Sequence, residues 1–295
     1  MQREITRELV RRLLPGRMAE SNKGSYGSVL AAAGSMAYRG AAALCTEGAL
    51  RGGAGLVYLA SVEPVIQLVL SRTPECCACG CRTAANGGIH PRDADALGRW
   101  FADRHTVLLA GPGLGEGAAD VCKALLGRNA PWAGAVLDAD ALNALAAGKY
   151  RGDLPANTIL TPHPGEAARL LGLTVPELQA DREGAAVSLA EKYHGVAVLK
   201  GHHTLVAAPD GTVWRNETGN AGLAKGGSGD ILAGLTAGLL AAGLKQGRTP
   251  EDAAVCAVWL HGAAADRCAK RRSMTAMLPG DLFEDLGWIL GELGR

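Results

Sequence analysis

One stretch of the chain, residues 220–235, carries most of the information about its architecture. It reads Asn-Ala-Gly-Leu-Ala-Lys-Gly-Gly-Ser-Gly-Asp-Ile-Leu-Ala-Gly-Leu. A glycine-rich turn here runs into an apolar helical segment, and consecutive backbone amides at a helix start form a concave site for an anion. Asp230, beside that site, is suited to accept a proton from a hydroxyl group or to hold a cation. The alternative is a capping aspartate with glycines for tight packing. The turn lacks the Gly-Lys-Ser/Thr ending of a Walker A loop.

Upstream of this turn, short apolar runs alternate with helical patterns. Strands are expected over residues 28–33, 56–60, 106–110, 135–137, 158–160 and 196–199, followed by a hairpin over 204–207 and 212–214. Helices are expected over 40–51, 62–70, 117–126, 141–147, 166–171 and 175–193, and from 229 onward with breaks near 247 and 273–279. This alternation predicts parallel strands joined by right-handed crossovers. No linker or internal repeat interrupts it, so one α/β domain over residues 1–295 is predicted.

Glycine-rich or polar turns follow several of the predicted strands. In open α/β sheets, ligands bind in the crevice at the carboxyl ends of the strands. The chemistry is therefore expected on the turns at 111–115, 138–143, 161–166, 200–204 and 226–230.

Two basic side chains in these turns could either bind a ligand or be plain surface residues. His163 lies between two prolines that fix the backbone, so its imidazole is held for a ligand or is a plain surface residue. Lys200 follows a predicted strand and could reach a phosphate as a point charge, or lie along the surface. From the residues alone, His202 and His203 are expected to be solvated. His261 is expected to be a core or interface residue.

The residues alone also leave two interpretations for each of the other turns. Asp138, Asp140 and Asn143 follow a strand and could orient Mg²⁺ or its waters, or Asp140 could simply cap the next helix. The Gly-Pro-Gly-Leu-Gly turn at 111–115 could let its backbone approach a ligand closely, or be a tight turn. Small residues around Ala41 either make room for a ligand or serve packing.

The order and spacing of these blocks resemble one known family. Residues 220–230 resemble the anion-hole and aspartate motif of the ribokinase-like superfamily and, more narrowly, that of the ADP/ATP-dependent NAD(P)H-hydrate dehydratases. Further blocks are similar in the same order, at residues 23–42, 111–115, 136–143, 161–166 (Thr-Pro-His-Pro-Gly-Glu) and 198–204. The match covers roughly residues 5 to 290. Ser228 stands where threonine is common, and the epimerase domain often fused ahead of this one is expected to be absent.

The resemblance implies a fold and a set of site residues. The implied fold is a ribokinase-like three-layer α/β sandwich, whose mostly parallel central sheet has helices on both faces. Asp230 is implied to be catalytic, and the substrate contacts would come from Ala41, Gly113, His163 and Asp230. The implied nucleotide contacts are Lys200, Gly201, His202, His203, Thr204, Gly226, Gly227, Ser228 and Gly229.

The resemblance also implies a reaction, the repair of the S epimer of hydrated NADH or NADPH. The terminal phosphoryl group of ADP or ATP would pass to the hydroxyl of the hydrated ring, phosphate would leave, and NAD(P)H would re-form. Stand-alone relatives favour ADP, and Mg²⁺ is the implied cofactor. The alternative is a small-molecule kinase of the same superfamily, of the hydroxymethylpyrimidine or hydroxyethylthiazole kinase type. A non-catalytic nucleotide sensor is disfavoured by the intact Asp230.

Composition sets the expected surroundings of the protein. A net charge of +1 over 295 residues disfavours a nucleic-acid partner held by bulk electrostatics. The longest apolar stretch, residues 231–244, is too short to span a bilayer, and no membrane partner is expected. A cytoplasmic location is expected because the N-terminus reads as an amphipathic helix rather than a signal peptide, with one face formed by Ile5, Leu9, Val10, Leu13 and Leu14. Relatives suggest a homo-oligomer, possibly a tetramer, and a functional link to an NAD(P)H-hydrate epimerase.

Four of the eight cysteines crowd together, as Cys76, Cys77, Cys79 and Cys81. Their spacing matches no common zinc pattern. We expect small residues in a variable segment, with a redox or adventitious metal role as the alternative.

Overall fold

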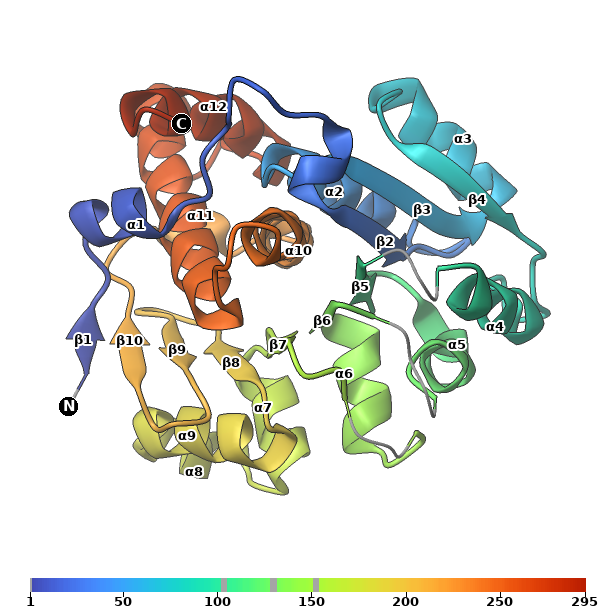
Figure 1. The fold of residues 1–295 in the computed structure, drawn as a ribbon. Coiled ribbons are helices and arrows are strands. Elements are labelled where there is room, and N and C mark those ends of the chain that lie inside the picture. The colour runs from blue at the N-terminus through green and yellow to red at the C-terminus, as the bar shows by residue number, and fades with distance from the viewer. Residues whose placement is uncertain (1, 102–104, 128–131, 151–153) are drawn as a thin grey trace.

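The computed structural model describes residues 2–101, 105–127, 132–150 and 154–295. In this part of the chain, ten strands form one sheet in the order β1-β10-β9-β8-β7-β6-β5-β2-β3-β4 (Figure 1). The strands are β1 (Arg3–Glu4), β2 (Ser28–Ala32), β3 (Leu56–Val62), β4 (Cys77–Cys81), β5 (Thr106–Ala110), β6 (Gly134–Leu137), β7 (Thr158–Leu160), β8 (Val196–Leu199), β9 (Leu205–Ala207) and β10 (Val213–Arg215).

Most of the sheet is parallel, as predicted. Val29 at the centre of β2 lies opposite Val57 of β3 and Val107 of β5, in parallel register. Only β9 breaks this pattern, since it pairs antiparallel with both β8 and β10. The six predicted parallel strands and the hairpin are confirmed to within two residues.

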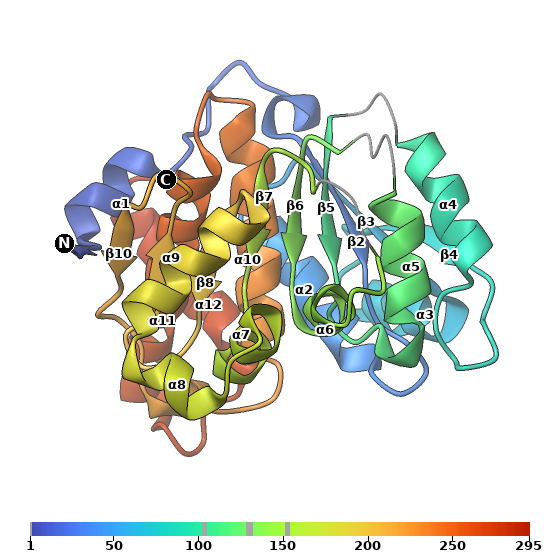
Figure 2. The ribbon, with the colours of Figure 1, turned by 90° about the horizontal axis from the view of Figure 1, so that it is seen from below.

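Helices cover both faces of the sheet, so the chain has three layers (Figures 1 and 2). Side chains of β2 alternate between two cores, with Val29 and Ala31 in one and Leu30 and Ala32 in the other. The first core is closed by α1 (Arg7–Leu13), α2 (Arg39–Arg51), α3 (Glu63–Arg72), α10 (Ser228–Leu244), α11 (Pro250–Arg272) and α12 (Leu282–Glu292). The second is closed by α4 (Pro91–Trp100), α5 (Ala118–Leu125), α6 (Ala139–Ala146), α7 (Pro164–Leu171), α8 (Val175–Ala180) and α9 (Arg182–Tyr193). The predicted three-layer α/β sandwich is confirmed.

The cysteine-rich segment was missed as secondary structure. It forms β4, the edge strand paired with β3, because alternating cysteine, alanine and glycine give little strand signal. Cys76 and Cys81 are buried, Cys77 is exposed, and burial raises the pKa of the Cys76 and Cys81 thiols to about 12. Thiols with such pKa values are weak nucleophiles at neutral pH. The expectation that these cysteines are simply small residues in a variable segment stays a prediction.

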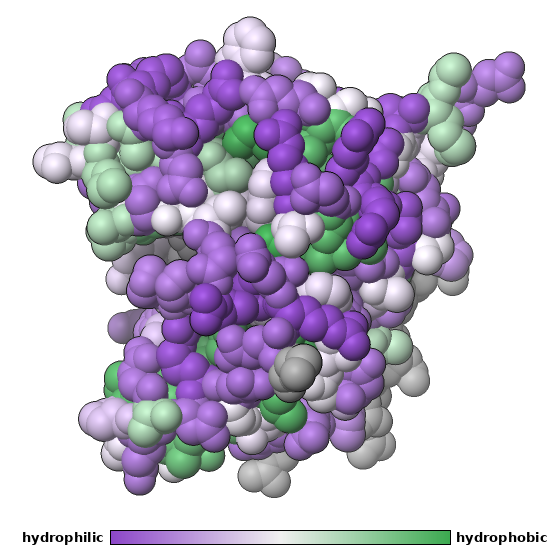
Figure 3. All heavy atoms as spheres, turned by 90° about the vertical axis from the view of Figure 1, so that its left-hand side faces the viewer, coloured by the Kyte–Doolittle hydropathy of each residue, from purple (hydrophilic) through white to green (hydrophobic). Residues whose placement is uncertain are grey.

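No helix within the described residues is long and apolar enough to cross a membrane. The face shown in Figure 3 is mostly hydrophilic, and its apolar residues lie in separate small areas.

Helix α10 touches α2 backbone to backbone. A Cβ added to Gly234 would lie 2.1 Å from the Cys45 carbonyl oxygen, and one added to Gly238 would lie 2.1 Å from that of Ala49. Almost every residue of α10 is buried. These contacts leave no space for a side chain and fix the position of the helix that begins at the glycine-rich turn.

We expect Gly238→Ala to lower the free energy of unfolding by about 1–3 kcal/mol or more, because the added methyl group overpacks a backbone contact. Gly287 on α12 is exposed with nothing within 4 Å of an added Cβ. Gly287→Ala is therefore the matched control and should be neutral, or stabilising by up to about 1 kcal/mol through helix propensity. Urea unfolding followed by circular dichroism measures both. Equal stabilities for the two variants would contradict the contact.

Candidate functional site

The predicted turns meet at one edge of the sheet. A Cβ added to Gly111 would lie 1.8 Å from the Asp138 carbonyl oxygen. The Thr161 hydroxyl donates to Asp138 Oδ1 over 2.8 Å, and Lys200 Nζ lies 2.7 Å from the same oxygen. A Cβ on Gly229 would lie 3.5 Å from Lys200 Nζ. The turns after β5, β6, β7 and β8 therefore converge with the start of α10.

The glycine-rich turn begins α10 as the sequence predicts. Gly227 precedes the helix with φ 102°, in the left-handed region where glycine is favoured. A Cβ there would lie 2.6 Å from Leu44 Cδ1 of α2. Gly226, by contrast, has nothing within 4 Å of an added Cβ. The Ser228 amide donates to the Lys225 carbonyl over 3.3 Å. The positive end of a 17-residue helix and the open space beside Gly226 suit a phosphate group.

Lys200 is neither a surface lysine nor a free cation. Its ammonium lies 2.7 Å from Asp138 Oδ1 and 3.9 Å from Glu166 Oε2, and the three side chains are 18%, 3% and 5% exposed. Burial alone would lower the pKa of Lys200, but the carboxylates of Asp138 and Glu166 hold it above its usual value. The lysine charge compensates a buried acidic cluster. Any contact with a phosphate would share that charge.

Asp230 lies in the first turn of α10, next to this cluster. Burial and the negative charge of Asp138 raise the pKa of the Asp230 carboxyl to about 6, while Lys200 opposes the shift. A carboxylate with such a pKa is ionised at neutral pH yet a better proton acceptor than an ordinary aspartate. Geometry and electrostatics both fit a general base.

His163 has a structural role that the sequence did not reveal. It is the N-cap of α7, where its Nδ1 accepts from the amides of Gly165 at 3.0 Å and Glu166 at 3.4 Å. Glu166 completes a capping box by accepting from the His163 backbone N–H at 2.8 Å. The ring is still half exposed. Partial burial and the nearby charge of Lys200 lower the pKa of its imidazole, so a neutral ring is presented at the crevice.

The two small residues predicted to contact substrate lie together. Gly113 has φ 65°, and an added Cβ would lie 2.9 Å from Ala41 Cβ and 2.8 Å from the Tyr38 carbonyl oxygen. Tyr38, which no sequence motif indicated, is 58% exposed beside them. The amide of Gly115 donates to Asp140 Oδ2 over 2.8 Å. This end of the predicted site therefore has close backbone and small side chains, with the exposed Tyr38 ring beside them.

The 200–204 turn is held by a residue outside every predicted block. Arg182, the first residue of α9, donates from Nη1 to the His202 carbonyl over 2.5 Å and from Nη2 to the Leu199 carbonyl over 3.4 Å. His203 Nδ1 lies 2.9 Å from Glu217 Oε2. His202 is exposed and His203 half-buried, in partial agreement with the expectation of solvated rings. The Thr204 hydroxyl donates to the Gly201 carbonyl at 3.1 Å.

The suggested Mg²⁺ ligands are already engaged by hydrogen-bond donors. Asp138 Oδ1 binds Thr161 and Lys200, Asp140 Oδ2 binds the Gly115 amide, and Asn143 Oδ1 accepts from the Arg169 guanidinium at 2.8 Å. Among the described residues, no three His, Cys, Asp or Glu side chains are grouped to hold a metal ion. A metal role for Asp138, Asp140 and Asn143 stays a prediction.

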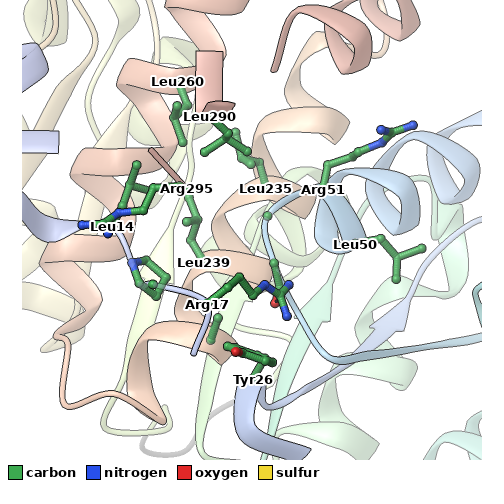
Figure 4. Close-up of a pocket in the computed structure, with 15 residues that line it drawn as sticks. Leu14, Arg17, Tyr26, Leu50, Arg51, Leu235, Leu239, Leu260, Leu290 and Arg295 are labelled. Atoms are coloured by element: carbon green, nitrogen blue, oxygen red, sulfur yellow. The ribbon is translucent and has the colours of Figure 1, made fainter. Parts of the chain in front are cut away.

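A pocket of about 280 Å³ lies away from this edge, between the end of α2, the middle of α10 and the last residues of the chain (Figure 4). Leu235 and Leu239 form part of its wall, with Arg17 and Arg51 also lining it. None of the predicted site residues lines it. The chemistry is therefore assigned from the turns at the sheet edge.

Comparisons with known proteins agree with this geometry. A family model described as NAD(P)H-hydrate dehydratase matches residues 29–287. The chain belongs to this family. A curated ADP-dependent (S)-NAD(P)H-hydrate dehydratase from Bacillus subtilis is 38% identical over 283 residues, 95% of this chain and 95% of that protein. The crystal structure of an ADP/ATP-dependent NAD(P)H-hydrate dehydratase from Bacillus subtilis, co-crystallised with ATP/Mg²⁺, matches with a TM-score of 0.84 at 36% identity, covering 98% of both chains.

Longer members of the dehydratase family also match. The bifunctional NAD(P)H-hydrate repair enzyme Nnr from Moorella thermoacetica is 42% identical over 296 residues, which is 99% of this chain but 54% of that protein. The chain spans about half the length of the first curated relatives it matches. The structural matches confirm the predicted ribokinase-like fold.

We expect Lys200→Met to destabilise the protein in a pH-dependent way. Removing the ammonium leaves Asp138 and Glu166 buried without a cation, which costs about 3–5 kcal/mol. The loss should be largest at pH 8 and smaller at pH 5, because protonation of Glu166 and Asp230, whose pKa values burial raises, relieves the repulsion. Thermal midpoints at the two pH values test this. Lys245→Met, at an exposed position, is the control, and equal losses for both variants would refute the buried pair.

Proposed function

We propose that this chain catalyses the nucleotide-dependent dehydration of the S epimer of hydrated NADH and NADPH. ADP, converted to AMP and phosphate, is the expected co-substrate, and ATP can supply the same terminal phosphoryl group. The observation that carries the proposal is Asp230. Its carboxyl, with a pKa of about 6, lies in the first turn of α10 beside the glycine-rich turn at residues 226–229. Membership of the NAD(P)H-hydrate dehydratase family supports the substrate.

The chemistry follows from leaving-group ability. Asp230 accepts the proton of the ring hydroxyl while that oxygen attacks the terminal phosphorus, and the bond to the bridging oxygen of the nucleotide breaks. The carbon–oxygen bond to the new phosphate ester then breaks, with the electron pair leaving on phosphate. The neighbouring ring carbon loses a proton, and the ring double bond re-forms. Alignment of the two substrates and neutralisation of phosphate charge are what such a transfer requires of a protein.

The residues at the edge of the sheet divide between these tasks. The amides of Gly226, Gly227, Ser228 and Gly229 would bind the transferring phosphoryl group. Lys200, Gly201, His202, His203 and Thr204 would contact the rest of the nucleotide. We propose Ala41, Gly113 and His163 as contacts to the hydrated dinucleotide, at the other end of the crevice.

Mg²⁺ is part of the proposal because the Bacillus subtilis relative was co-crystallised with ATP/Mg²⁺. Asp138 fits such an ion, since its Oδ2 takes no hydrogen bond from the described residues and lies 3.9 Å from a Cβ built on Gly229. Mg²⁺ commonly binds one or two carboxylates together with substrate phosphates. When bound, it would neutralise phosphate charge, and Asp138 would hold it on the protein side.

The wider setting is also proposed. The chain would act as one dehydratase domain over residues 1–295, as a homo-oligomer in the cytoplasm. An NAD(P)H-hydrate epimerase would supply the S epimer, and the bifunctional names of several relatives support this link. A small-molecule kinase of the same superfamily would share Asp230 and the amide turn, but the family match favours the dehydratase.

The decisive experiment mixes the purified protein with hydrated NADH, Mg²⁺ and either ADP or ATP. We expect dihydronicotinamide absorbance to recover only with nucleotide, because hydroxide must become phosphate before it leaves. One nucleotide phosphoryl bond should be consumed for each NADH restored. ATP consumption with a pyrimidine or thiazole alcohol, and no recovery of NADH, would show a kinase instead.

Asp230→Asn should lower turnover at least about 10²-fold while nucleotide still binds, since it removes the base and keeps its size. In the unmodified protein, kcat/KM should fall as the pH drops through about 6, because Asp230 must be ionised to accept the proton. Steady-state rates between pH 5 and 8 test the second point. Asp120→Asn, on the exposed surface of α5, is the control. Near-normal turnover in folded Asp230→Asn would remove this residue from the mechanism.

A further inference from the structure

We propose that Asp266 of α11 is a positioning residue that holds the phosphate-binding turn, residues 226–229, in its binding conformation. The nucleotide named as ligand rests on the proposed function. Asp266 lies in none of the blocks singled out in the sequence, and its neighbours in space come from a segment more than forty positions earlier.

Both oxygens of Asp266 bind the chain that leads into this turn. Oδ2 accepts from the Gly219 amide over 2.8 Å, and Oδ1 accepts from Asn220 Nδ2 over 2.8 Å. Gly219 has φ 107°, which only glycine adopts readily. Within the described residues, no Lys, Arg or His forms an ion pair with Asp266. Among the described residues, the hydrogen bonds of this carboxylate go to the loop.

The same helix binds the preceding residues at two more points. Asn216 Nδ2 donates to the Val258 carbonyl over 3.3 Å, and the Thr218 hydroxyl donates to the Trp259 carbonyl over 3.0 Å. Gly262 allows this approach, since an added Cβ would lie 2.3 Å from Thr218 Oγ1. The segment before the turn thus lies along α11 with its polar groups paired.

Beyond Asn220 the chain is anchored again before it reaches α10. Asn220 Oδ1 accepts from the Gly222 amide at 2.9 Å. Lys225 Nζ donates to the Thr275 carbonyl, over 2.6 Å, and to the Met277 carbonyl. Backbone hydrogen bonds continue from Asn220 to the turn, since the Leu223 amide donates to the Asn220 carbonyl, the Lys225 amide to the Leu223 carbonyl and the Ser228 amide to the Lys225 carbonyl. The loop that Asp266 holds is therefore joined to the phosphate-binding turn by a chain of hydrogen bonds.

Helix α11 also supports the turn directly. His261, five residues before Asp266, is 7% exposed and lies close to the Ser228 backbone. Residues five apart on an α-helix point about 140° apart, so His261 and Asp266 lie on different faces of α11. Amides held in place before the ligand arrives cost less to order on binding.

The geometry requires a carboxylate rather than an amide at position 266. Two donors, the Gly219 N–H and the Asn220 side-chain amide, face two acceptor oxygens. An asparagine of the same shape offers one acceptor, and its NH₂ group would face a second donor. Asp266→Asn should therefore release one end of the loop without creating a cavity.

The test is nucleotide binding measured by titration calorimetry with Mg²⁺ and ADP or ATP. We expect Asp266→Asn to weaken the Kd at least about tenfold, in line with loss of a hydrogen bond to a charged group. The KM for nucleotide should rise with it, while the KM for hydrated NADH stays near its original value. A merely structural residue would not produce this split.

Asp285→Asn is the matched control. Asp285 on α12 is 1% exposed and pairs with Arg271 of α11 at 2.9 Å, so its loss weakens the same helix away from the loop. We expect a lower thermal midpoint with an unchanged nucleotide Kd. If Asp285→Asn weakens nucleotide binding as much as Asp266→Asn does, general destabilisation explains both and the proposal is wrong.

Asn220→Ala removes the other side of the contact and covers the case in which Asp266→Asn does not fold. It should raise the nucleotide Kd by a similar factor. The double variant Asp266→Asn with Asn220→Ala should lose less binding free energy than the two single variants added together. Unchanged nucleotide affinity in folded Asp266→Asn or Asn220→Ala would overturn the inference. If hydrated NADH is not restored but nucleotide binding still weakens selectively, only the proposed reaction fails. A chain that binds neither nucleotide overturns both.

Discussion

A single buried ammonium group holds the working edge of this protein together. Lys200 follows β8, Asp138 follows β6, and Glu166 lies in the first turn of α7, which comes after the strand between them. Without the lysine charge, these carboxylates and Asp230 would repel one another in a space with little water. Burial is the main cause of the raised pKa of the Asp230 carboxyl and of the lowered pKa of the His163 imidazole, and the charges of this cluster come next, Asp138 for Asp230 and Lys200 for His163.

The cluster also explains why the proposed base is well suited to its task. Asp230 is buried and close to Asp138, which raises its pKa, and close to Lys200, which limits the rise. The carboxyl stays ionised at neutral pH but binds a proton more readily than a surface aspartate. This arrangement lowers the free energy of unfolding at neutral pH, because the ionised Asp230 carboxylate is stabilised less in the folded chain than in water.

The sequence predicted the strands and helices of the fold better than the side-chain contacts between them. Apolar runs such as the one around Val107 identify strands because both faces of the sheet are buried. The same signal failed at Cys77–Cys81, an edge strand without branched side chains. Asp230 and the amide turn were found because their chemistry is local. The partner of Lys200 and the role of Asp266 were not, because each contact joins residues far apart in the chain and leaves no pattern in the sequence.

The glycines between α2 and α10 have a mechanical consequence. Where two backbones touch without a side chain between them, no change of rotamer can let one helix slide past the other. Ala41 lies in the first turn of α2 and α10 begins at Ser228, so the two ends of the proposed site share one rigid wall. Any closure around bound molecules must then come from the opposite wall, where the turns are joined to the sheet by strands and side-chain bonds rather than by locked helices.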